Sequence, residues 1–155
     1  IARIFNTYGP NMDKNDGRVV SNFINQSINN NNITLHREGL QTRSFCYVAD
    51  LVEGIYRLLH SDYAQPVNIG NPDEISILDF AKEIIALTGT SQKIVFHDLP
   101  KDDPKQRKPD IARAKEILGW EPTVDRAEGL KITYEYFKNL PAEHLYKHAH
   151  PKEFN

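Results

Sequence analysis

The sequence is poor in cysteine, in net charge and in long hydrophobic runs. Cys46 is the only cysteine among 155 residues, so the chain forms no internal disulfide and suits a reducing compartment. The formal net charge of −2 gives no overall attraction for nucleic acid, so any anion site must be local. No run approaches the roughly 20 apolar residues that span a bilayer, and no signal-peptide pattern opens the chain. We therefore expect a cytoplasmic protein without a membrane segment in this chain, which leaves open an anchor in a preceding segment.

Two further absences concern the start of the chain and its motifs. There is no initiator Met, and Ile1–Phe5 has the character of the middle of a buried strand. There is also no Gly-x-Gly-x-x-Gly turn of the kind that receives a dinucleotide pyrophosphate. We expect the chain to be the C-terminal part of a longer protein.

The segments that are present alternate between two periodicities. Short β-prone runs are found at 1–5, 33–36, 44–48, 66–70 and 93–97, and amphipathic helical patterns at 18–28, 50–60, 76–88, 111–118 and 125–140. Ser76 and Asp79 resemble a capping box, while Gly89 and Gly119 follow the ends of predicted helices. This alternation predicts an α/β fold with a largely parallel sheet.

Polar residues that follow or precede these elements are the candidates for a site. Asn6 comes directly after the first strand, where side chains of a parallel sheet meet ligands, although an Asn there can equally tie a turn. Arg18 and Ser21 stand at a helix N-terminus, which favours an anion; the alternative is an exposed pair of Arg18 with Asp16. Arg43 precedes a strand, where a structural ion pair is the alternative reading.

The segment from Asp102 to Pro122 is the most informative part of the sequence. Its charged loop delivers Arg107 and Lys108, and Asp110 then begins a short helix that ends at Gly119. Such a layout places a cation next to a rigid helix, as a phosphate or carboxylate site requires.

Three segments carry a resemblance to a known family. They are RIFNTYGP at 3–10, NDGRVVSNF at 15–23, and RKPD at 107–110 within the charged segment. In this order they resemble the extended short-chain dehydrogenase/reductase enzymes, also called the NAD-dependent epimerase/dehydratase family. The segments at 15–23 and 107–110 resemble most the branch that decarboxylates UDP-glucuronate.

The resemblance implies a function and a set of site residues. It implies NAD-dependent decarboxylation of UDP-glucuronate to UDP-xylose through a 4-keto intermediate, with NAD as the cofactor and a UDP-sugar as the partner. Arg107 is the expected catalytic residue, and Thr7 and Arg18 the expected cofactor-binding residues. The expected substrate-binding residues are Asn6, Ser21, Asn22, Phe23, His36, Arg43 and Arg107. At His36 the branch often has Tyr, so a His that stacks on uracil and a plain strand-end His are both open.

The resemblance also implies an architecture. We expect the C-terminal part of a Rossmann-type, doubly wound parallel sheet together with a smaller substrate-binding α/β domain. Segments 1–5 and 66–70 should lie parallel in the nucleotide-binding sheet. The pyrophosphate-binding turn and the family's Tyr-x-x-x-Lys pair are expected outside this chain. We also expect a homodimer.

Several alternatives stay open at this level. A dTDP-glucose 4,6-dehydratase or a UDP-sugar 4-epimerase would share the fold and NAD, and a non-catalytic module that binds nucleotide sugars is a rival of another class. Asp50 is expected to cap a helix and Trp120 to lie in the core. His144, His148 and His150 are accompanied by no cysteine or carboxylate cluster, so we expect no metal site.

Overall fold

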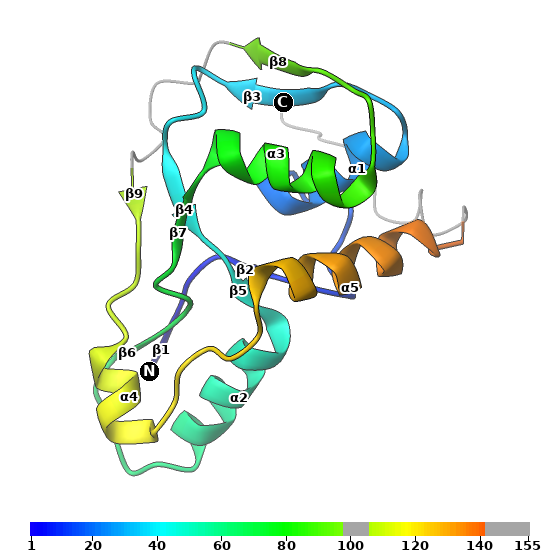
Figure 1. Ribbon diagram of the computed structural model, residues 1–155. Helices are drawn as coiled ribbons and strands as arrows, with labels where there is room; N and C mark the ends of the chain where they lie inside the picture. Colours follow the sequence, from blue (N-terminus) through cyan, green and yellow to red (C-terminus); the bar gives the residue numbers. More distant parts are fainter. Residues whose placement is uncertain (98–105, 142–155) are drawn as a thin grey trace, which may run out of the picture.

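The computed structural model describes residues 1–97 and 106–141 and has a mixed α/β fold, as the sequence predicts (Figure 1). The helices are α1 (Val19–Ile28), α2 (Val48–Leu59), α3 (Ile77–Thr88), α4 (Ala112–Leu118) and α5 (Arg126–Lys138). The strands are β1 (Ala2–Ile4), β2 (Thr7–Tyr8), β3 (Ile33–His36), β4 (Thr42–Ser44), β5 (Cys46–Tyr47), β6 (Val67–Ile69), β7 (Glu74–Ser76), β8 (Ile94–His97) and β9 (Gln106–Arg107).

Most strand pairs are parallel. β1 pairs with β6, with Ala2 opposite Val67, and β2 pairs with β5 and β3 with β8 in the same sense. The exception is β4, which lies between an antiparallel β7 and a parallel β9. The pairing of β1 with β6 confirms that the segments near 1–5 and 66–70 lie parallel in one sheet. Strands β2, β7 and β9 are additions that the sequence did not predict.

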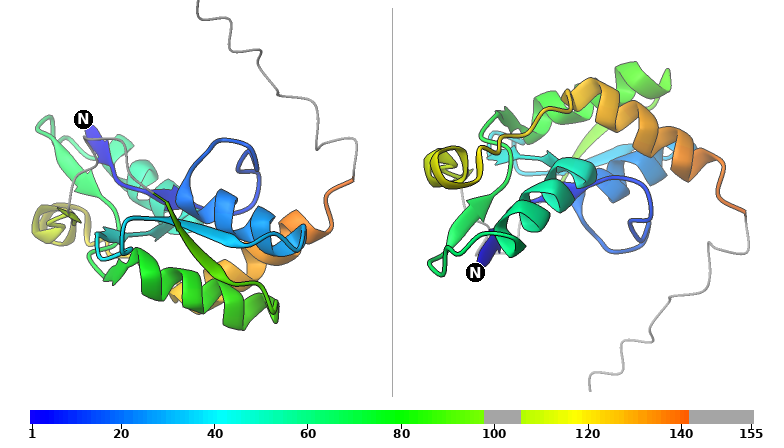
Figure 2. Two further views of the ribbon diagram at one scale, coloured as in Figure 1. Left: turned by 90° about the horizontal axis from the view of Figure 1, so that it is seen from above. Right: turned by 90° about the horizontal axis from the view of Figure 1, so that it is seen from below.

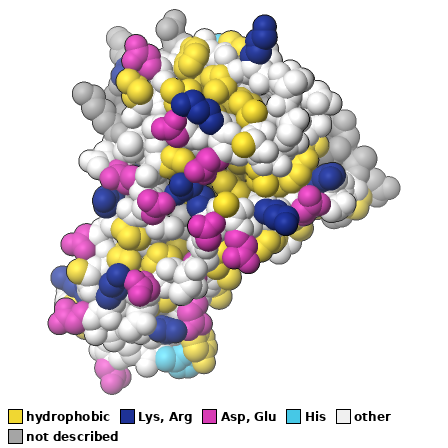
Figure 3. Space-filling view, in the orientation of Figure 1, with side chains coloured by type: hydrophobic (Ala, Val, Ile, Leu, Met, Phe, Trp, Pro, Cys, Tyr) yellow, Lys and Arg dark blue, Asp and Glu magenta, His cyan; other side chains and the backbone are white. Residues whose placement is uncertain are grey.

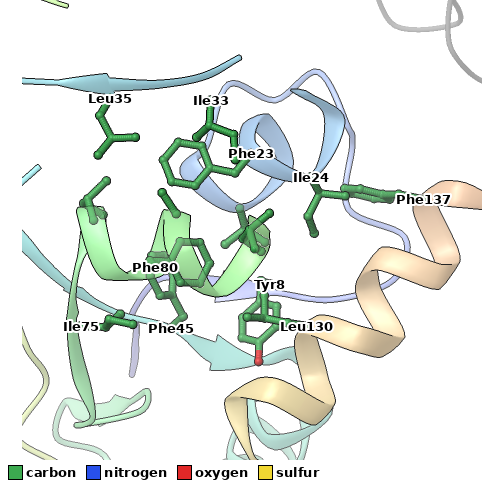
Figure 4. Packing of buried hydrophobic residues seen from close by; sticks show 14 residues of the cluster. Tyr8, Phe23, Ile24, Ile33, Leu35, Phe45, Ile75, Phe80, Leu130 and Phe137 are labelled. Carbon is green, nitrogen blue, oxygen red and sulfur yellow. The ribbon is translucent and has the colours of Figure 1, made fainter. Parts of the chain in front are cut away.

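Two hydrophobic clusters hold these elements together. In the larger one, the ring of Phe80 of α3 lies 6.1 Å from that of Phe23 of α1 and stacks on that of Phe45 at 4.4 Å, measured between centroids (Figure 4). Helix α5 packs beside α3 and closes this cluster (Figure 2). The smaller cluster packs Trp120 and Ile69 among α2, α4 and β6. The face of the molecule shown in Figure 3 carries acidic and basic side chains interspersed with apolar ones, and neither charge predominates there.

Local signals account for several helix ends. The Ser76 hydroxyl accepts a hydrogen bond from the Asp79 amide at 3.0 Å, so the predicted capping box starts α3. Gly89 and Gly119 follow α3 and α4 with φ of 64° and 57°, in the left-handed region that glycine adopts at least cost. The sequence predicted all three positions.

Asp50 and Trp120 show one prediction that was wrong and one that was right. Asp50 lies inside α2, which begins at Val48, so it is not the cap of that helix. Its buried carboxylate accepts from the Thr123 hydroxyl and the Val124 amide, each at 3.0 Å. Trp120 is 2% exposed, and its indole donates to the Asp50 carbonyl at 3.0 Å, which confirms its place in the core.

Candidate functional site

The first candidate residues follow β1 at the carboxyl end of that strand. The Asn6 carbonyl accepts from the Cys46 amide at 2.8 Å, which carries the chain from β1 into the β2–β5 pair. The Thr7 hydroxyl donates back to the Phe5 carbonyl at 2.8 Å. The two side chains are half-buried and therefore stay accessible at this edge, where parallel sheets generally present ligand-binding groups.

Arg18 is held at the beginning of α1 by Asp16. The Asp16 carboxylate accepts from the Arg18 amide at 2.9 Å and lies 3.3 Å from the guanidinium Nε. The Arg18 side chain remains 66% exposed, so this pair is weak and leaves the guanidinium accessible. The pairing with Asp16 is thus observed, and Arg18 also lines a pocket; its role in binding an anion stays a prediction.

Arg43 and Arg107 are neighbours across two parallel strands. They are Cα partners in the register of β4 with β9, so their side chains leave the same face of that sheet. Arg43 is only 8% exposed and donates to the Thr42 carbonyl at 2.7 Å, while Arg107 is exposed. Two arginine side chains on one face of a sheet concentrate positive charge there, which favours an anion near them.

A pocket of about 340 Å³ brings these residues together. The predicted site residues that line it are Asn6, Thr7, Arg18, Arg43 and Arg107. They come from segments that lie up to a hundred residues apart in the chain, and three of the five are arginines. The arrangement is therefore suited to a ligand with two or more negative charges and polar groups next to them.

A second pocket of about 200 Å³ adjoins the first and shares Gly17, Val19 and Arg43 with it. It contains the predicted residues Asn22, Phe23 and His36, with Asn22 and His36 exposed and Phe23 part of its apolar wall. Because Arg43 lines both pockets, one elongated anionic ligand could occupy both, with its charge at the shared wall.

Ser21, a predicted substrate-binding residue, lines neither of these two pockets. It is fully buried, and its hydroxyl lies within hydrogen-bond distance of the Asp16 carboxylate and of the Arg18 carbonyl, at 2.5 and 2.9 Å. The structure thus gives Ser21 a supporting place beneath the loop that presents Arg18.

The structure also reveals lining residues that the sequence did not suggest. Met12, Gly17, Val19, Val20 and Phe45 line the first pocket, and Thr34 and Gln41 line the second. Gln41 directly precedes β4, a strand whose start the sequence did not predict at this position, so no local signal pointed to it. Gly17, with φ of 79°, allows the turn that precedes Arg18.

One pair in the chain does have the spacing Tyr-x-x-x-Lys, contrary to our expectation that this spacing lies outside it. Tyr134 and Lys138 are both in α5, with the Lys138 ammonium 5.6 Å from the centre of the Tyr134 ring. Tyr134 packs against the larger hydrophobic cluster, and neither residue lines the two pockets described above. Spacing alone therefore gives this pair no role in the site.

Three further observations concern ionisable groups and the membrane. Burial raises the pKa of the Cys46 thiol to about 12, so this thiol is a poor nucleophile. Within 1–97 and 106–141 no group of three His, Cys, Asp or Glu could hold a metal ion; His144, His148 and His150 lie outside these ranges. In the same ranges we find no helix with the length and apolar character to cross a membrane.

Residues 1–70 match the model of the NAD dependent epimerase/dehydratase family. The fold is similar to UDP-glucose 4-epimerase from Thermotoga maritima, solved with UDP-glucose, at a TM-score of 0.85 and 30% identity over 88% of this chain and 45% of that one. It is also similar to UDP-glucuronic acid 4-epimerase from Bacillus cereus, solved with UDP-glucuronic acid and NAD. The TM-score is 0.82 and the identity 30%, over 89% of this chain and 44% of that one. The resemblance to the epimerase/dehydratase enzymes that the sequence indicated is therefore confirmed.

The chain is also similar to the UDP-glucuronic acid decarboxylases. It is 51% identical to decarboxylase 6 of Arabidopsis thaliana over 138 residues, which cover 89% of this chain and 40% of the relative. It is 52% identical to decarboxylase 1 of Xenopus tropicalis, over 89% of this chain and 33% of that relative. The chain thus spans about 40% or less of the length of these two relatives.

Proposed function

We propose that the natural full-length protein decarboxylates UDP-glucuronate to UDP-xylose, with NAD as cofactor, through a 4-keto intermediate. The observation that carries this proposal is the convergence of Arg18, Arg43 and Arg107 on one pocket. Three guanidinium groups from separate elements can neutralise a diphosphate, and planar forks match phosphate oxygens better than ammonium groups do. The roughly 50% identity to decarboxylases supports the choice of sugar.

The two pockets suggest how the substrate lies. We place the diphosphate at Arg43, on the wall that the pockets share, and the uracil in the smaller pocket against His36 and Phe23. Asn22 is exposed at that pocket and can hydrogen-bond the nucleotide. The sugar then extends into the larger pocket toward Asn6, whose amide can bind its hydroxyl groups.

Thr7 and Arg18 are the residues of this chain that would face NAD. They fit it because a hydroxyl and an accessible guanidinium line the same pocket as Asn6, next to the proposed sugar position. When bound, NAD supplies the oxidation of the sugar at C4 and the later return of the hydride. Ser21 supports the segment that presents Arg18, through its contact with Asp16.

Arg107 has two candidate roles. As a catalytic residue it would hold the C6 carboxylate, which is β to the C4 carbonyl of the oxidised sugar. It would then stabilise the enolate formed when the C5–C6 bond breaks, carbon dioxide leaves and the electron pair moves to the C4 oxygen. As a binding residue it would share the diphosphate with Arg43, its neighbour in register.

Arg107→Lys separates the two roles, because it keeps the charge and loses the planar fork. We expect a large fall in kcat with a smaller change in UDP affinity, measured by steady-state kinetics and calorimetry. Arg113→Lys, a matched change on α4 outside the pocket, should leave both unchanged. If Arg107→Lys raises KM and leaves turnover intact, Arg107 is a binding residue and its catalytic role is wrong.

Product analysis tests the activity and its rivals together. The proposal requires carbon dioxide and UDP-xylose from UDP-glucuronate and NAD. UDP-galacturonate as the product would identify a 4-epimerase instead, and dehydration of dTDP-glucose would identify a 4,6-dehydratase. Binding of UDP without turnover of any of these sugars would favour a non-catalytic module.

The remaining proposals concern architecture and setting. We propose that residues 1–155 form the C-terminal half of the protein. In it, β1 and β6 belong to the nucleotide-binding sheet, and most of the other residues form the substrate-binding domain. We also propose that the protein acts in the cytoplasm as a homodimer, as the family resemblance implies. Light scattering on the natural full-length protein tests the dimer, and a monomer at micromolar concentration would contradict it.

A further inference from the structure

Strand β9, which carries Arg107, has only two residues and depends on its neighbours for its position. It pairs with β4 through Thr42 opposite Gln106 and Arg43 opposite Arg107. The Ser44 hydroxyl adds one bond, to the Arg107 carbonyl at 3.2 Å. In Figure 1 β9 lies at the edge of this sheet, next to β4 and with β7 beyond it. A strand this short needs further contacts to keep one register.

Glu74 of β7 supplies such contacts from the far side of β4. Its carboxylate accepts two hydrogen bonds from the Gln106 side chain, at 2.8 and 3.0 Å, and one from the Thr42 hydroxyl at 2.8 Å. The Lys108 ammonium lies 3.6 Å away. One side chain thus joins all three strands of the sheet, and it holds the residues on both sides of Arg107.

Side chains alternate between the two faces of a strand, and this alternation determines on which face Arg107 lies. Gln106 and Lys108 lie on the face of Glu74, so Arg107, between them, lies on the opposite face together with Arg43. The carboxylate also lies next to the Lys108 charge on the face away from the pocket. Arg107 therefore presents its guanidinium to the pocket while its backbone is held from behind.

We propose that Glu74 is the positioning residue for Arg107, which it holds in register beside Arg43 without touching the ligand. This inference rests on the proposed function for the identity of the ligand. It assigns Glu74 a role that is distinct from general stability. Hydrogen bonds from Gln106 and Thr42, together with the Lys108 charge, keep the pKa of Glu74 below its usual value, so the carboxylate stays ionised near neutral pH.

A double-mutant cycle with UDP-glucuronate as the ligand tests the proposal in the natural full-length protein, because this ligand carries both the diphosphate and the C6 carboxylate that Arg107 could bind. Glu74→Ala should weaken UDP-glucuronate binding about 10-fold, at the lower end of the loss that supporting residues show at metal sites. In the Arg107→Ala background the same change should have no further effect, because no guanidinium remains to be positioned. Glu53→Ala, which removes an exposed carboxylate paired with Arg57 on α2, is the matched control and should not alter UDP-glucuronate affinity.

Two milder variants keep the test valid if Glu74→Ala does not fold. Glu74→Gln keeps one acceptor oxygen and the size of the side chain, and it should weaken UDP-glucuronate binding less than Glu74→Ala. Gln106→Ala removes only the exposed amide that donates to both oxygens of Glu74, and its effect should likewise vanish in the Arg107→Ala background.

The outcomes that overturn the proposal are distinct from failure of the proposed function. Wild-type UDP-glucuronate affinity in Glu74→Ala and Gln106→Ala, with clear loss in Arg107→Ala, would overturn the role of Glu74 alone. So would effects of Glu74→Ala and Arg107→Ala on this affinity that simply multiply. If the wild type binds no UDP-glucuronate, the proposed function fails, and hydrogen exchange of the Arg107 amide still decides: faster exchange in Glu74→Ala supports the positioning role and unchanged exchange overturns it.

Discussion

Arg43→Ala is the sharpest single perturbation of the proposed site. Arg43 is the arginine that lines both pockets, and at 8% exposure it is the most buried of the three. Its guanidinium is fixed by a 2.7 Å hydrogen bond to the Thr42 carbonyl, so little rotamer entropy is lost when a ligand binds. Truncation removes the cation from the wall where we place the diphosphate.

The expected size of the effect follows from these contacts. Hydrogen bonds to a charged group contribute about 1.5–3 kcal/mol. Loss of this contribution should weaken UDP binding by roughly 10- to 150-fold. Because Arg43 is buried, added salt should reduce the difference less than it would for an exposed arginine such as Arg18.

Titration calorimetry with UDP on the natural full-length protein measures this difference directly. Arg43→Lys should recover part of the affinity, since it restores the charge without the fork. Arg113→Ala, which removes an exposed arginine of α4 outside the pocket, serves as the matched control. Unchanged UDP affinity in a folded Arg43→Ala protein would remove Arg43 from the site and refute the diphosphate assignment.

Two further predictions concern stability and reactivity. Ser76→Ala removes the cap of α3 and should lower the free energy of unfolding by about 1 kcal/mol, measured by chemical denaturation; an unchanged midpoint would contradict the capping role. Cys46 should resist alkylation at pH 8 in the folded protein, because burial raises its pKa to about 12. Rapid labelling of Cys46 in the native state, detected by mass spectrometry, would refute this slow alkylation. Since the thiol ionises more readily in the unfolded chain, the folded protein should also lose stability as the pH rises from about 9 toward 12.

The site residues that sequence analysis found have local signals. Asn6 ends a strand and Arg18 begins a helix, and both positions are legible from the hydrophobic pattern around them. Arg107 stands before a helix that Gly119 terminates, so its loop could be recognised as well. The structure brings Asn6, Arg18 and Arg107 to one pocket because these ends meet at the same side of the fold.

Most of the relations that sequence analysis missed are long-range. No periodicity indicates that Gln106 and Arg107 form a strand beside β4, or that Glu74 reaches across that strand to Gln106. The local sequence predicts that Asp50 caps a helix, yet its carboxylate accepts hydrogen bonds from residues more than seventy positions away. Such contacts depend on tertiary packing, which overrides the local preference of a single residue.

A crystal structure of the natural full-length protein with UDP-glucuronate and NAD would test the central claim most directly. We predict diphosphate oxygens within hydrogen-bond distance, about 2.7–3.2 Å, of the Arg43 guanidinium, with the uracil against His36 and the sugar beside Asn6. A diphosphate bound elsewhere, with the pocket of Arg18, Arg43 and Arg107 occupied only by solvent, would contradict it.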